Sequence, residues 1–304
     1  MITDEILAVD IGGTNIRVGL VDPDLSLRHM TMEPSVELLE VADPSQSLLE
    51  HLKNYLNQYG GEVNARPRAV SIGFPATIDK SRRVVLSTSN IRSMQNLAIV
   101  DFLEEHLEVP VVIDCDVNML MRFDIHHHDV GDEGVVIGCY VGTGFGNSIS
   151  INGRIHLGAH GAAGELGHLP MVGLTRQCGC GNIGCIETVA SGLYLREIAQ
   201  EHFPQTPIGD IFLHHASHPV IQEYLGYLAI PVASEINILD PLAVILGGGV
   251  LHAPGFPLPD LEREIIARTR KPYPANDVKF LYSKAGQGNG VIGAGIYAFE
   301  KLGV

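Results

Sequence analysis

This chain shows the same hydrophobic pattern twice: short apolar runs alternate with segments in which apolar residues recur at helical spacing. The apolar runs predict strands, because they are short and end at glycine, proline or acidic residues. They cover residues 6–10, 16–22, 27–33, 69–75 and 111–114 in the first round, and 134–142, 148–153, 242–249 and 278–283 in the second. Helical spacing predicts a helix capped by Asp43 with Pro44 at its first position, and helices over 96–107, 117–125, 187–201, 219–239, 258–270 and 290–301.

Two strand-rich beginnings, each followed by helices, predict an α/β protein of two domains with a ligand cleft between them. We expect a small N-terminal α/β domain formed by residues 1–117 together with residues 288–304. A larger α/β domain is expected over residues 118–287. It contains a glycine-rich segment, residues 155–187, which has neither helical nor strand periodicity and predicts a loop.

The composition is that of a globular protein, and it limits the classes of partner. Of the 304 residues, 45% are hydrophobic and 18% are charged, and the formal net charge is −15. Nucleic-acid binding relies on basic residues that neutralise phosphates, so this acidic surface disfavours nucleic acid, and it disfavours an anionic membrane surface in the same way. An anionic small molecule stays compatible, because backbone N–H groups and bound metal ions supply positive charge locally.

The N-terminal sequence and the cysteines predict a cytoplasmic protein. The first residues, MITDEILAVDIGG, lack the basic start and the cleavage site of a signal peptide, and no later apolar segment is long enough to span a bilayer. The cysteines number five, whereas a disulfide framework uses cysteines in pairs.

Three glycine-rich turns after apolar strands predict a site for a nucleoside triphosphate. They are Asp10-Ile11-Gly12-Gly13-Thr14, Gly142-Thr143-Gly144-Phe145-Gly146 and Gly247-Gly248-Gly249. Glycine lets backbone N–H groups approach an anion, and threonine adds a hydroxyl donor. The turns are neither Walker A loops nor dinucleotide-binding fingerprints. Each turn alone is equally compatible with a hairpin, but the three together favour a triphosphate bound by both domains, with Asp10 near Mg²⁺.

His168, Cys178, Cys180 and Cys185 form a cluster of metal-ligand types with the spacing H-x9-C-x-C-x4-C. Imidazole and thiolates are the ligands of tetrahedral Zn²⁺. Four protein ligands leave no position for an activated water, so the sequence predicts a structural zinc rather than a catalytic one. Three reduced cysteines in a loop are the alternative, but free cysteines are usually scattered and buried.

Two carboxylates beside this cluster are candidates for contacts to a sugar. Glu165 precedes His168 by three residues and Glu187 follows Cys185 by two, so a bound metal would fix both. Carboxylates accept hydrogen bonds from vicinal hydroxyls, and the second ring nitrogen of His168 is available for another contact. Alternatively, each glutamate is a surface residue or, for Glu187, a favourable charge at a helix N-terminus.

A further carboxylate, Asp116, follows the end of the expected strand 111–114. From a strand end it can point into a cleft and take the proton from an attacking hydroxyl. Its alternative is an N-cap for the next helix, and one residue can serve both roles. Asn90 is a further candidate for contact to the sugar.

Several motifs, taken together, are those of a known family. They are DIGGTNIRVG at 10–19, GAHGAAGELGH at 158–168, CGCGNIGCIE at 178–187 and VILGGG at 244–249, and GVIGAG at 290–295 fits as well. The chain resembles the ROK family of bacterial sugar kinases and sugar-responsive repressors. The E-x-G-H and C-x-C-G-x-x-G-C-x-E signatures are highly specific.

The resemblance implies an actin-like ATPase (ribonuclease H-like) fold in two domains, and phosphoryl transfer from ATP, with Mg²⁺, to a sugar hydroxyl, usually O6. It implies Asp116 as the general base, zinc bound by the four cluster residues, and a homodimer. The sugar set is Asp116, Glu165, His168 and Glu187, with Asn90 as a candidate. Together with the three turns, the resemblance assigns the nucleotide to Asp10, Gly12, Gly13, Thr14, Asn15, Thr143, Gly144, Gly247 and Gly248.

Two departures from the family pattern bear on the sugar. Kinases of the family for glucose-like sugars usually have Asn-Asp where this chain has Cys115-Asp116, and that Asn contacts the sugar; they also usually have G-x-P-G where this chain has GFPA at 73–76. GFPA and D-V-N, with AHGAAGELGHLP, are most similar to the family's D-allose kinases. Loss of an amide that grips an equatorial hydroxyl suits allose, which differs from glucose by an axial 3-hydroxyl. We therefore expect D-allose 6-phosphate as the product, with glucokinase, fructokinase or N-acetylhexosamine kinase activity as alternatives.

A sugar-responsive regulator without catalysis is the alternative from another class. The repressors that the chain resembles carry a helix-turn-helix domain ahead of the sugar-binding part, whereas the first expected strand here begins at Ile6. That start and the acidic charge favour the kinase over a DNA-binding regulator.

Overall fold

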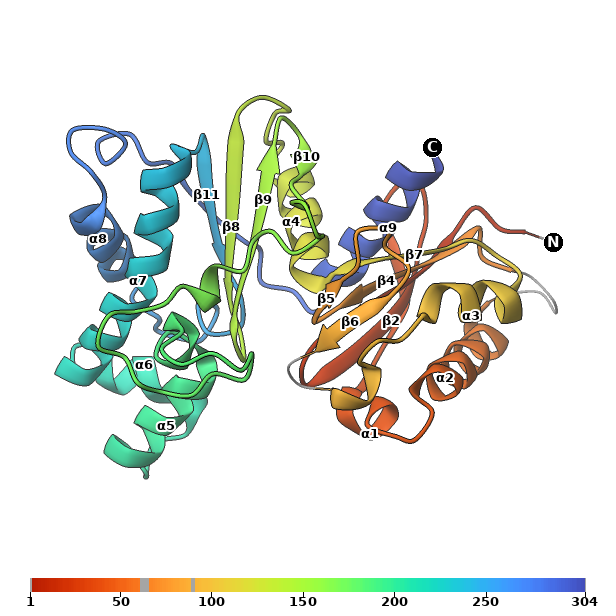
Figure 1. Ribbon diagram of the computed structural model, residues 1–304, viewed down its shortest axis with the longest axis horizontal. Helices are drawn as coiled ribbons and strands as arrows, with labels where there is room; N and C mark the ends of the chain where they lie inside the picture. The colour runs from red at the N-terminus through yellow and green to blue at the C-terminus, as the bar shows by residue number, and fades with distance from the viewer. Residues whose placement is uncertain (1, 61–65, 89–90, 304) are drawn as a thin grey trace. The chain divides into compact units, whose positions relative to one another are not determined.

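The computed structural model describes residues 2–60, 66–88 and 91–303, which form two compact units (Figure 1). Unit 1 consists of residues 1–130, 157–163 and 286–304, and unit 2 of residues 131–156 and 164–285. Unit 1 therefore extends beyond the expected boundary at residue 117. It also includes the short segment 157–163, which was expected in the larger domain.

Unit 1 is built on a five-stranded mixed sheet in the order β3-β2-β1-β4-β7. The strands are β1 (Ile6–Ile11), β2 (Asn15–Val21), β3 (Leu27–Pro34), β4 (Ala69–Phe74) and β7 (Val111–Cys115). The first three form an antiparallel meander, and β4 and β7 continue the sheet in parallel with β1. A separate hairpin is formed by β5 (Ala76–Ile78) and β6 (Val85–Thr88).

Helices cover both faces of this sheet (Figure 1). On one face pack α1 (Ser35–Leu39), α2 (Pro44–Tyr59) and α3 (Ile99–Leu107), and on the other pack α4 (Asp116–His127) and α9 (Asn289–Leu302); the 3-10 turn η1 (Arg92–Met94) follows the hairpin. Side chains alternate along a strand, so Leu7 and Val9 of β1 belong to the first core and Ile6 and Ala8 to the second. Because α4 packs against α9, it belongs to unit 1.

Unit 2 repeats this strand arrangement. Its strands are β8 (Val135–Val141), β9 (Phe145–Ile151), β10 (Arg154–Ile155), β11 (Ala243–Gly247) and β12 (Phe280–Tyr282), in the order β10-β9-β8-β11-β12. Again the first three strands are antiparallel, and the last two run parallel to the first strand of the unit. The two units therefore share one sheet topology, whereas the two strand-rich beginnings in the sequence predicted only that there would be two α/β domains.

The helices of unit 2 share one apolar core with its sheet. They are α5 (Gly192–His202), α6 (Ile211–His215), α7 (Pro219–Leu239) and α8 (Leu258–Arg268), with 3-10 turns η2 (Leu166–His168), η3 (Ile186–Thr188) and η4 (Ile208–Asp210). The expected helix 187–201 is wrong at its start. Glu187 lies in η3, and α5 begins only after Ser191, whose hydroxyl caps the N–H of Tyr194.

Among the described residues, no helix has the length and the apolar character that a membrane crossing requires.

Candidate functional site

Asp10 lies near the end of β1 and is buried. It faces Arg17 across the antiparallel pair of β1 and β2, and an Arg17 nitrogen lies 3.3 Å from its carboxylate. Burial raises the pKa of Asp10, and the charge and the hydrogen bond of Arg17 oppose that rise. Arg17 was not among the predicted site residues, although its position directly opposite Asp10 follows from the meander.

The first turn of α9 also lies against Asp10. A side chain at Gly290 would place its Cβ 2.5 Å from the carboxyl carbon of Asp10, so only glycine allows this approach. The N-terminus of a helix favours a negative charge nearby, which suits an acidic group at this position. Gln287, just before the helix, accepts a hydrogen bond of 2.8 Å from Arg17. The C-terminal segment therefore helps to hold the Asp10–Arg17 pair.

The turn between β1 and β2 contains the predicted nucleotide residues Gly12, Gly13 and Thr14, and Asn15 is the first residue of β2. The turn is closed by a hydrogen bond of 2.9 Å from the Gly12 N–H to the Asn15 carbonyl. Ser35, the first residue of α1, braces it twice. Its hydroxyl donates to the Gly12 carbonyl at 2.9 Å, and its N–H donates to the Thr14 carbonyl at 3.0 Å. The turn is fixed from within unit 1, and Thr14 is exposed at its tip.

Asp116 is the first residue of α4 and is partly buried. Its carboxylate accepts a hydrogen bond of 2.9 Å from the N–H of Val117, as expected of an acidic residue in the first turn of a helix. Gly73 of β4 pairs with Asp10 of β1, and a Cβ at Gly73 would lie 3.3 Å from the Cα of Asp116. Unit 1 therefore brings Asp10, the turn after it and Asp116 to the same edge of its sheet.

Asp114, two residues before Asp116, is the centre of a buried charged network. Its side chain is 1% exposed and lies 3.3 Å from Arg82 and 3.0 Å from Arg122. The side-chain amide of Asn118 donates to the same carboxylate at 2.9 Å. Sequence reasoning did not select Asp114: Asn118 and Arg122 are near it on α4, but Arg82 comes from a distant segment, and no local motif joins the group.

In unit 2, Glu187 is joined to the predicted nucleotide loop 142–146. Its carboxylate accepts a hydrogen bond of 2.8 Å from the N–H of Phe145. A Cβ at Gly144 would overlap with the same carboxylate, so any larger residue there would displace the Glu187 side chain from this position. The carbonyl oxygens of Gly142 and Thr143 accept hydrogen bonds of 2.9 and 3.1 Å from the first N–H groups of α5. Glu187 thus supports the loop that contains Thr143 and Gly144.

The remaining predicted nucleotide residues, Gly247 and Gly248, lie at the end of β11 beside β8. The N–H of Val250, just after them, donates to the Val141 carbonyl at 3.0 Å. The glycine turn of β11 and the loop 142–146 of β8 and β9 therefore lie at the same edge of the second sheet.

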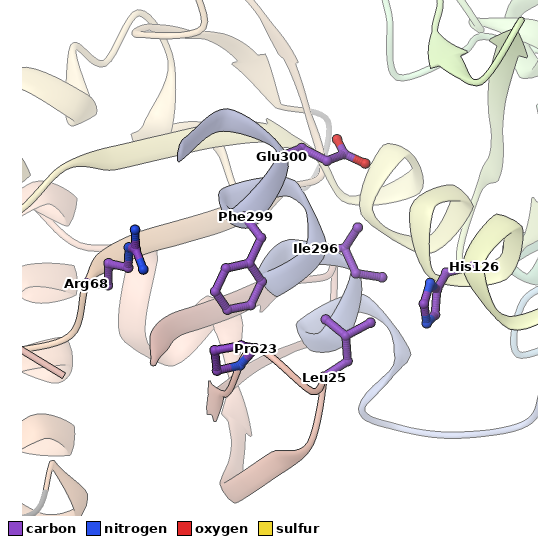
Figure 2. Close-up of a pocket in the computed structure, with 7 residues that line it drawn as sticks. All are labelled: Pro23, Leu25, Arg68, His126, Ile296, Phe299 and Glu300. Atoms are coloured by element: carbon purple, nitrogen blue, oxygen red, sulfur yellow. The ribbon is translucent and has the colours of Figure 1, made fainter. Parts of the chain in front are cut away.

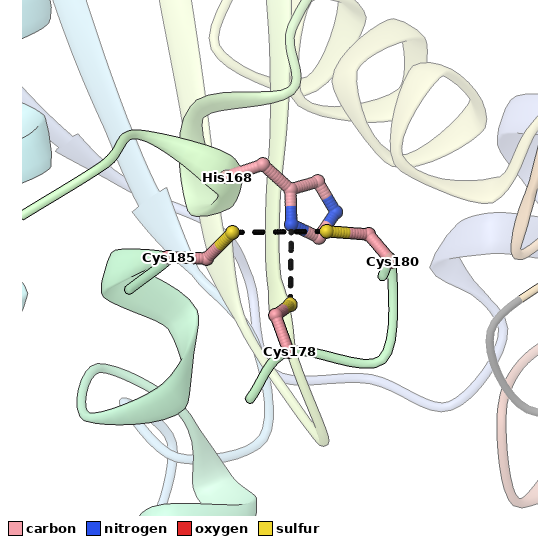
Figure 3. Close-up of side chains that lie close together, drawn as sticks. All are labelled: His168, Cys178, Cys180 and Cys185. Atoms are coloured by element: carbon pink, nitrogen blue, oxygen red, sulfur yellow. Dashed lines mark hydrogen bonds between the residues drawn. The ribbon is translucent and has the colours of Figure 1, made fainter. Parts of the chain in front are cut away.

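His168, Cys178, Cys180 and Cys185 come together in unit 2, and their ligand atoms all lie within 4.8 Å of one another (Figure 3). Nδ1 of His168 is 3.6 Å from the sulfur of Cys178, and the sulfurs of Cys180 and Cys185 are 3.7 Å apart. Ligands at about 2.0 to 2.3 Å from a tetrahedral zinc lie about 3.5 to 3.8 Å from one another. The donor set and its spacing therefore fit a tetrahedral zinc ion.

A tight turn presents two of these cysteines. The N–H of Cys178 donates to the Asn182 carbonyl at 2.8 Å, and the N–H of Gly181 donates to the Cys178 carbonyl at 3.1 Å. Cys185 lies beside Pro170 in an isolated bridge, which places the third sulfur next to the segment of His168. The glycine-rich sequence thus forms a compact ligand loop although it lacks regular periodicity.

The other ring nitrogen of His168, Nε2, lies 3.6 Å from the carboxylate of Glu165. A carboxylate on the outer nitrogen of a metal-binding histidine fixes the orientation of its ring. Glu165 is half exposed, and its partial burial raises its pKa; the charge of His168 opposes the rise and that of Glu187 adds to it. Unit 2 therefore assembles the predicted sugar residues Glu165, His168 and Glu187 around the cluster.

Asn90, the remaining predicted sugar residue, lies outside the described residues.

A hollow of about 320 Å³ lies elsewhere on unit 1, beside α9 (Figure 2). Among the described residues it is lined by Pro23, Leu25, Arg68, His126, Ile296, Phe299 and Glu300, none of which belongs to the predicted site. Glu300 connects it to the Asp114 network, because its carboxylate lies 3.1 Å from Arg122.

Comparison with known proteins shows what this chain is similar to. A sequence model of the ROK family matches residues 6–301. The N-acetyl-D-glucosamine kinase of Histophilus somni (strain 129Pt) is 30% identical over 260 residues, which are 79% of this chain and 82% of that protein. The N-acetylglucosamine repressor of Shigella flexneri is 25% identical over 284 residues, which are 86% of this chain and 69% of the repressor.

Among solved structures, a ROK family glucokinase from Streptomyces griseus in complex with glucose and AMPPNP matches with a TM-score of 0.78 and 25% identity, covering 96% of this chain and 98% of the glucokinase. Together with the duplicated sheet topology, this match defines the class of the protein as a two-domain α/β sugar kinase and confirms the predicted fold. The chain belongs to the ROK family.

Proposed function

We propose that this ROK-family sugar kinase transfers the γ-phosphoryl group of ATP to O6 of a hexose, with Asp116 as the general base. The observation that carries the proposal is the position of Asp116 at the start of α4, next to Gly73 and at the same sheet edge as Asp10 and the turn 12–15. That arrangement supports a carboxylate that accepts the proton of the attacking hydroxyl close to a triphosphate site.

Positioning and electrostatics account for most of the catalysis of phosphoryl transfer. We therefore assign most site residues to binding. Asp10, Gly12, Gly13, Thr14 and Asn15 of unit 1, with Thr143, Gly144, Gly247 and Gly248 of unit 2, are proposed to contact ATP. Bound Mg²⁺ would neutralise charge on the phosphates, and Asp10 is the residue proposed to lie near it, through water. The hydrogen bonds that brace the turn 12–15 would keep its N–H groups in place.

The hexose is proposed to contact Asp116, Glu165, His168 and Glu187, with Asn90 as a further contact. The cluster of His168 and the three cysteines would hold a structural zinc, which fixes the segment that presents Glu165 and Glu187. Because all four ligands come from the protein, the ion would have no role in the chemical step.

We propose D-allose as the preferred sugar, and the support for it comes from the residue before the base. Cys115 has no side-chain amide with which to grip an equatorial hydroxyl. The names of the relatives favour N-acetylglucosamine or glucose instead, and these hexoses are the second candidates. We further propose that the protein acts in the cytoplasm as a homodimer without nucleic acid as a partner.

A panel of hexoses tests the proposal. ADP release is measured with D-allose, D-glucose, D-fructose, N-acetyl-D-glucosamine and N-acetyl-D-mannosamine, and the phosphorylated position is assigned by NMR. Turnover of D-allose at the highest kcat/KM, with phosphate at O6, is expected. A higher kcat/KM for another hexose would replace allose but keep the kinase. Sugar binding without ADP release for every hexose would favour a non-catalytic regulator.

A further inference from the structure

The turn between β5 and β6 contains an arginine in a backbone conformation that suits glycine. Arg82 has a φ of 56°, and its side chain is 8% exposed. A left-handed conformation costs a residue with a side chain about 1 kcal/mol or more. Moreover, Nε and Nη2 of Arg82 are buried and make no hydrogen bond among the described residues, although Nη2 forms an ion pair with Asp114. The buried Nε and the left-handed φ both cost stability, so stability alone does not explain this residue.

The guanidinium of Arg82 connects three segments that are distant in sequence. Nη1 donates to the carbonyl oxygens of Ile78 and of Gly161, each at 3.3 Å. Nη2 lies 3.3 Å from the carboxylate of Asp114. The hairpin, the end of β7 and the segment 157–163 are therefore held by one planar group. A lysine could not make all of these contacts, because its single ammonium group lacks the planar set of N–H donors that reaches separate acceptors.

The segment 157–163 belongs to unit 1 and leads directly into Gly164 and Glu165. It is folded on itself, with the N–H of Ala163 donating to the Leu157 carbonyl at 3.2 Å. Gly161 has a φ of 80°, and a Cβ there would lie 2.6 Å from the Ile78 carbonyl. Glycine at 161 therefore lets the segment approach the hairpin closely enough to meet Arg82.

The two arginines on Asp114 differ in what else they hold. Arg122 is anchored on its other side by Glu300 at 3.1 Å and lies over the ring of Tyr297. It therefore connects Asp114 to the C-terminal helix. Arg82 instead connects Asp114 to the segment before Glu165. Because Asp114 is two residues before Asp116, Arg82 is the group that relates the base to that segment.

We propose that Arg82 is a positioning residue that fixes the segment 157–163 against the end of β7, directly before Asp116, so that the sugar hydroxyl meets the base in one geometry. This inference rests on the proposed function. Arg82 contacts neither substrate nor ATP in this account. Its loss should therefore affect the sugar and leave nucleotide binding unchanged. A displacement of about 1 Å at a reacting centre is enough to cost about 10²-fold in rate.

Arg82→Gly tests the role of the side chain without straining the backbone. Glycine readily adopts the left-handed φ, so the variant loses only the guanidinium and its contacts. The kcat/KM for the best hexose should fall about 10²-fold, through both a higher sugar KM and a lower kcat, with the KM for ATP within about twofold of the parent. Arg82→Lys should give an intermediate loss. Arg83→Lys is the matched control, since Arg83 pairs with Asp101 and Glu104 at the surface, and it should match the parent.

Gly161→Ala tests the same relationship from the other side and keeps Arg82. It should raise the sugar KM in the same way, and the double variant with Arg82→Gly should lose little more than either single variant. If Arg82→Gly does not fold, Gly161→Ala with Arg82→Lys carries the test. If folded Arg82→Gly or Gly161→Ala protein keeps the parent's kcat/KM for the sugar, this inference is wrong, but the proposed function stands. The same holds if kcat/KM falls equally for sugar and for ATP. A parent protein that phosphorylates no hexose would overturn the proposed function and this inference with it.

Discussion

The thiol of Cys115 donates a hydrogen bond to the carbonyl oxygen of Ala76, with the sulfur 3.1 Å from the oxygen. Both residues lie in the two motifs at which the sequence was expected to depart from glucose-like kinases. Phe74, two residues before Ala76, is also the strand neighbour of Cys115. The two departures are therefore one local arrangement, and a substitution at either position is expected to disturb the other.

The first prediction concerns this pair and the choice of sugar. Cys115→Asn places a larger, amide-bearing side chain against the Ala76 carbonyl, and Ala76→Gly lets the backbone there adjust. We expect the double variant to shift the ratio of kcat/KM for glucose over allose upward by about tenfold, the value of one good hydrogen bond. Cys115→Asn alone should raise this ratio less, because the Ala76 carbonyl then stays in place against the new side chain.

Steady-state kinetics with both hexoses measures this ratio, and Cys139→Ser, a change at a buried cysteine of unit 2, serves as the control. An unchanged ratio in the double variant would show that Cys115 does not select the sugar.

The second prediction concerns the base. Asp116→Asn keeps the shape of the side chain and an oxygen that can accept the hydrogen bond from Val117, so α4 should form as before. It removes the group proposed to take the proton, and general-base catalysis typically contributes about 10²- to 10⁴-fold. We expect kcat to fall by that factor while the sugar dissociation constant, measured by calorimetry, changes little. Asp101→Asn, at a surface carboxylate paired with Arg83, is the control. Turnover near the parent rate would exclude Asp116 as the base.

The third prediction concerns the metal. A single change of Cys178, Cys180 or Cys185 to Ser removes one thiolate from a four-ligand set, and we expect about one zinc per chain to be lost. Because the ligand loop fixes Glu165 and Glu187, the sugar KM should rise while kcat is less affected. Elemental analysis gives the metal content, and Cys139→Ser should retain the parent's metal. Parent protein purified without chelators and free of zinc would contradict the assignment.

Local patterns in the sequence predicted most of the fold. The strands of both sheets and the long helices have apolar spacings of their own, so β1, β4, β8 and α7 were found from single windows. By contrast, α1 and the hairpin of β5 and β6 are short, and their form depends on packing against the rest of unit 1. The cluster of His168 and the cysteines was visible because its ligand types are rare and closely spaced.

The charged network around Asp114 could not be predicted, for a physical reason. Arg122 is near Asp114 on the adjoining helix, but Arg82, which contacts Asp114, and Glu300, which contacts Arg122, come from segments that meet only after the sheet and α9 have packed. No short sequence motif predicts such a contact between distant segments. The same holds for Arg17 and Gly290, which became part of the Asp10 environment through strand register and helix docking.

The last prediction concerns a buried carboxyl group of unit 2. Glu235 of α7 is 5% exposed; its carboxylate accepts a hydrogen bond of 2.9 Å from Asn147 and lies 3.8 Å from the thiol of Cys139. Burial raises the pKa of Glu235 from 4.5 to about 8, and the two hydrogen bonds oppose the rise. The folded state therefore keeps a proton that the unfolded chain releases above pH 4.5. Stability from this group is complete below pH 4.5 and is lost as the pH rises towards 8.

Glu235→Gln removes this titration and keeps an oxygen for Asn147. The free energy of unfolding of the parent minus that of the variant should fall between pH 5 and 8 with a slope of up to about 1.4 kcal/mol per pH unit, and should level off above pH 8. Urea unfolding at a series of pH values gives this difference. Glu223→Gln is the control on the same helix, since Glu223 is exposed and accepts a hydrogen bond from Tyr227. A difference independent of pH for Glu235→Gln would show that Glu235 ionises in the folded protein as it does in the unfolded chain.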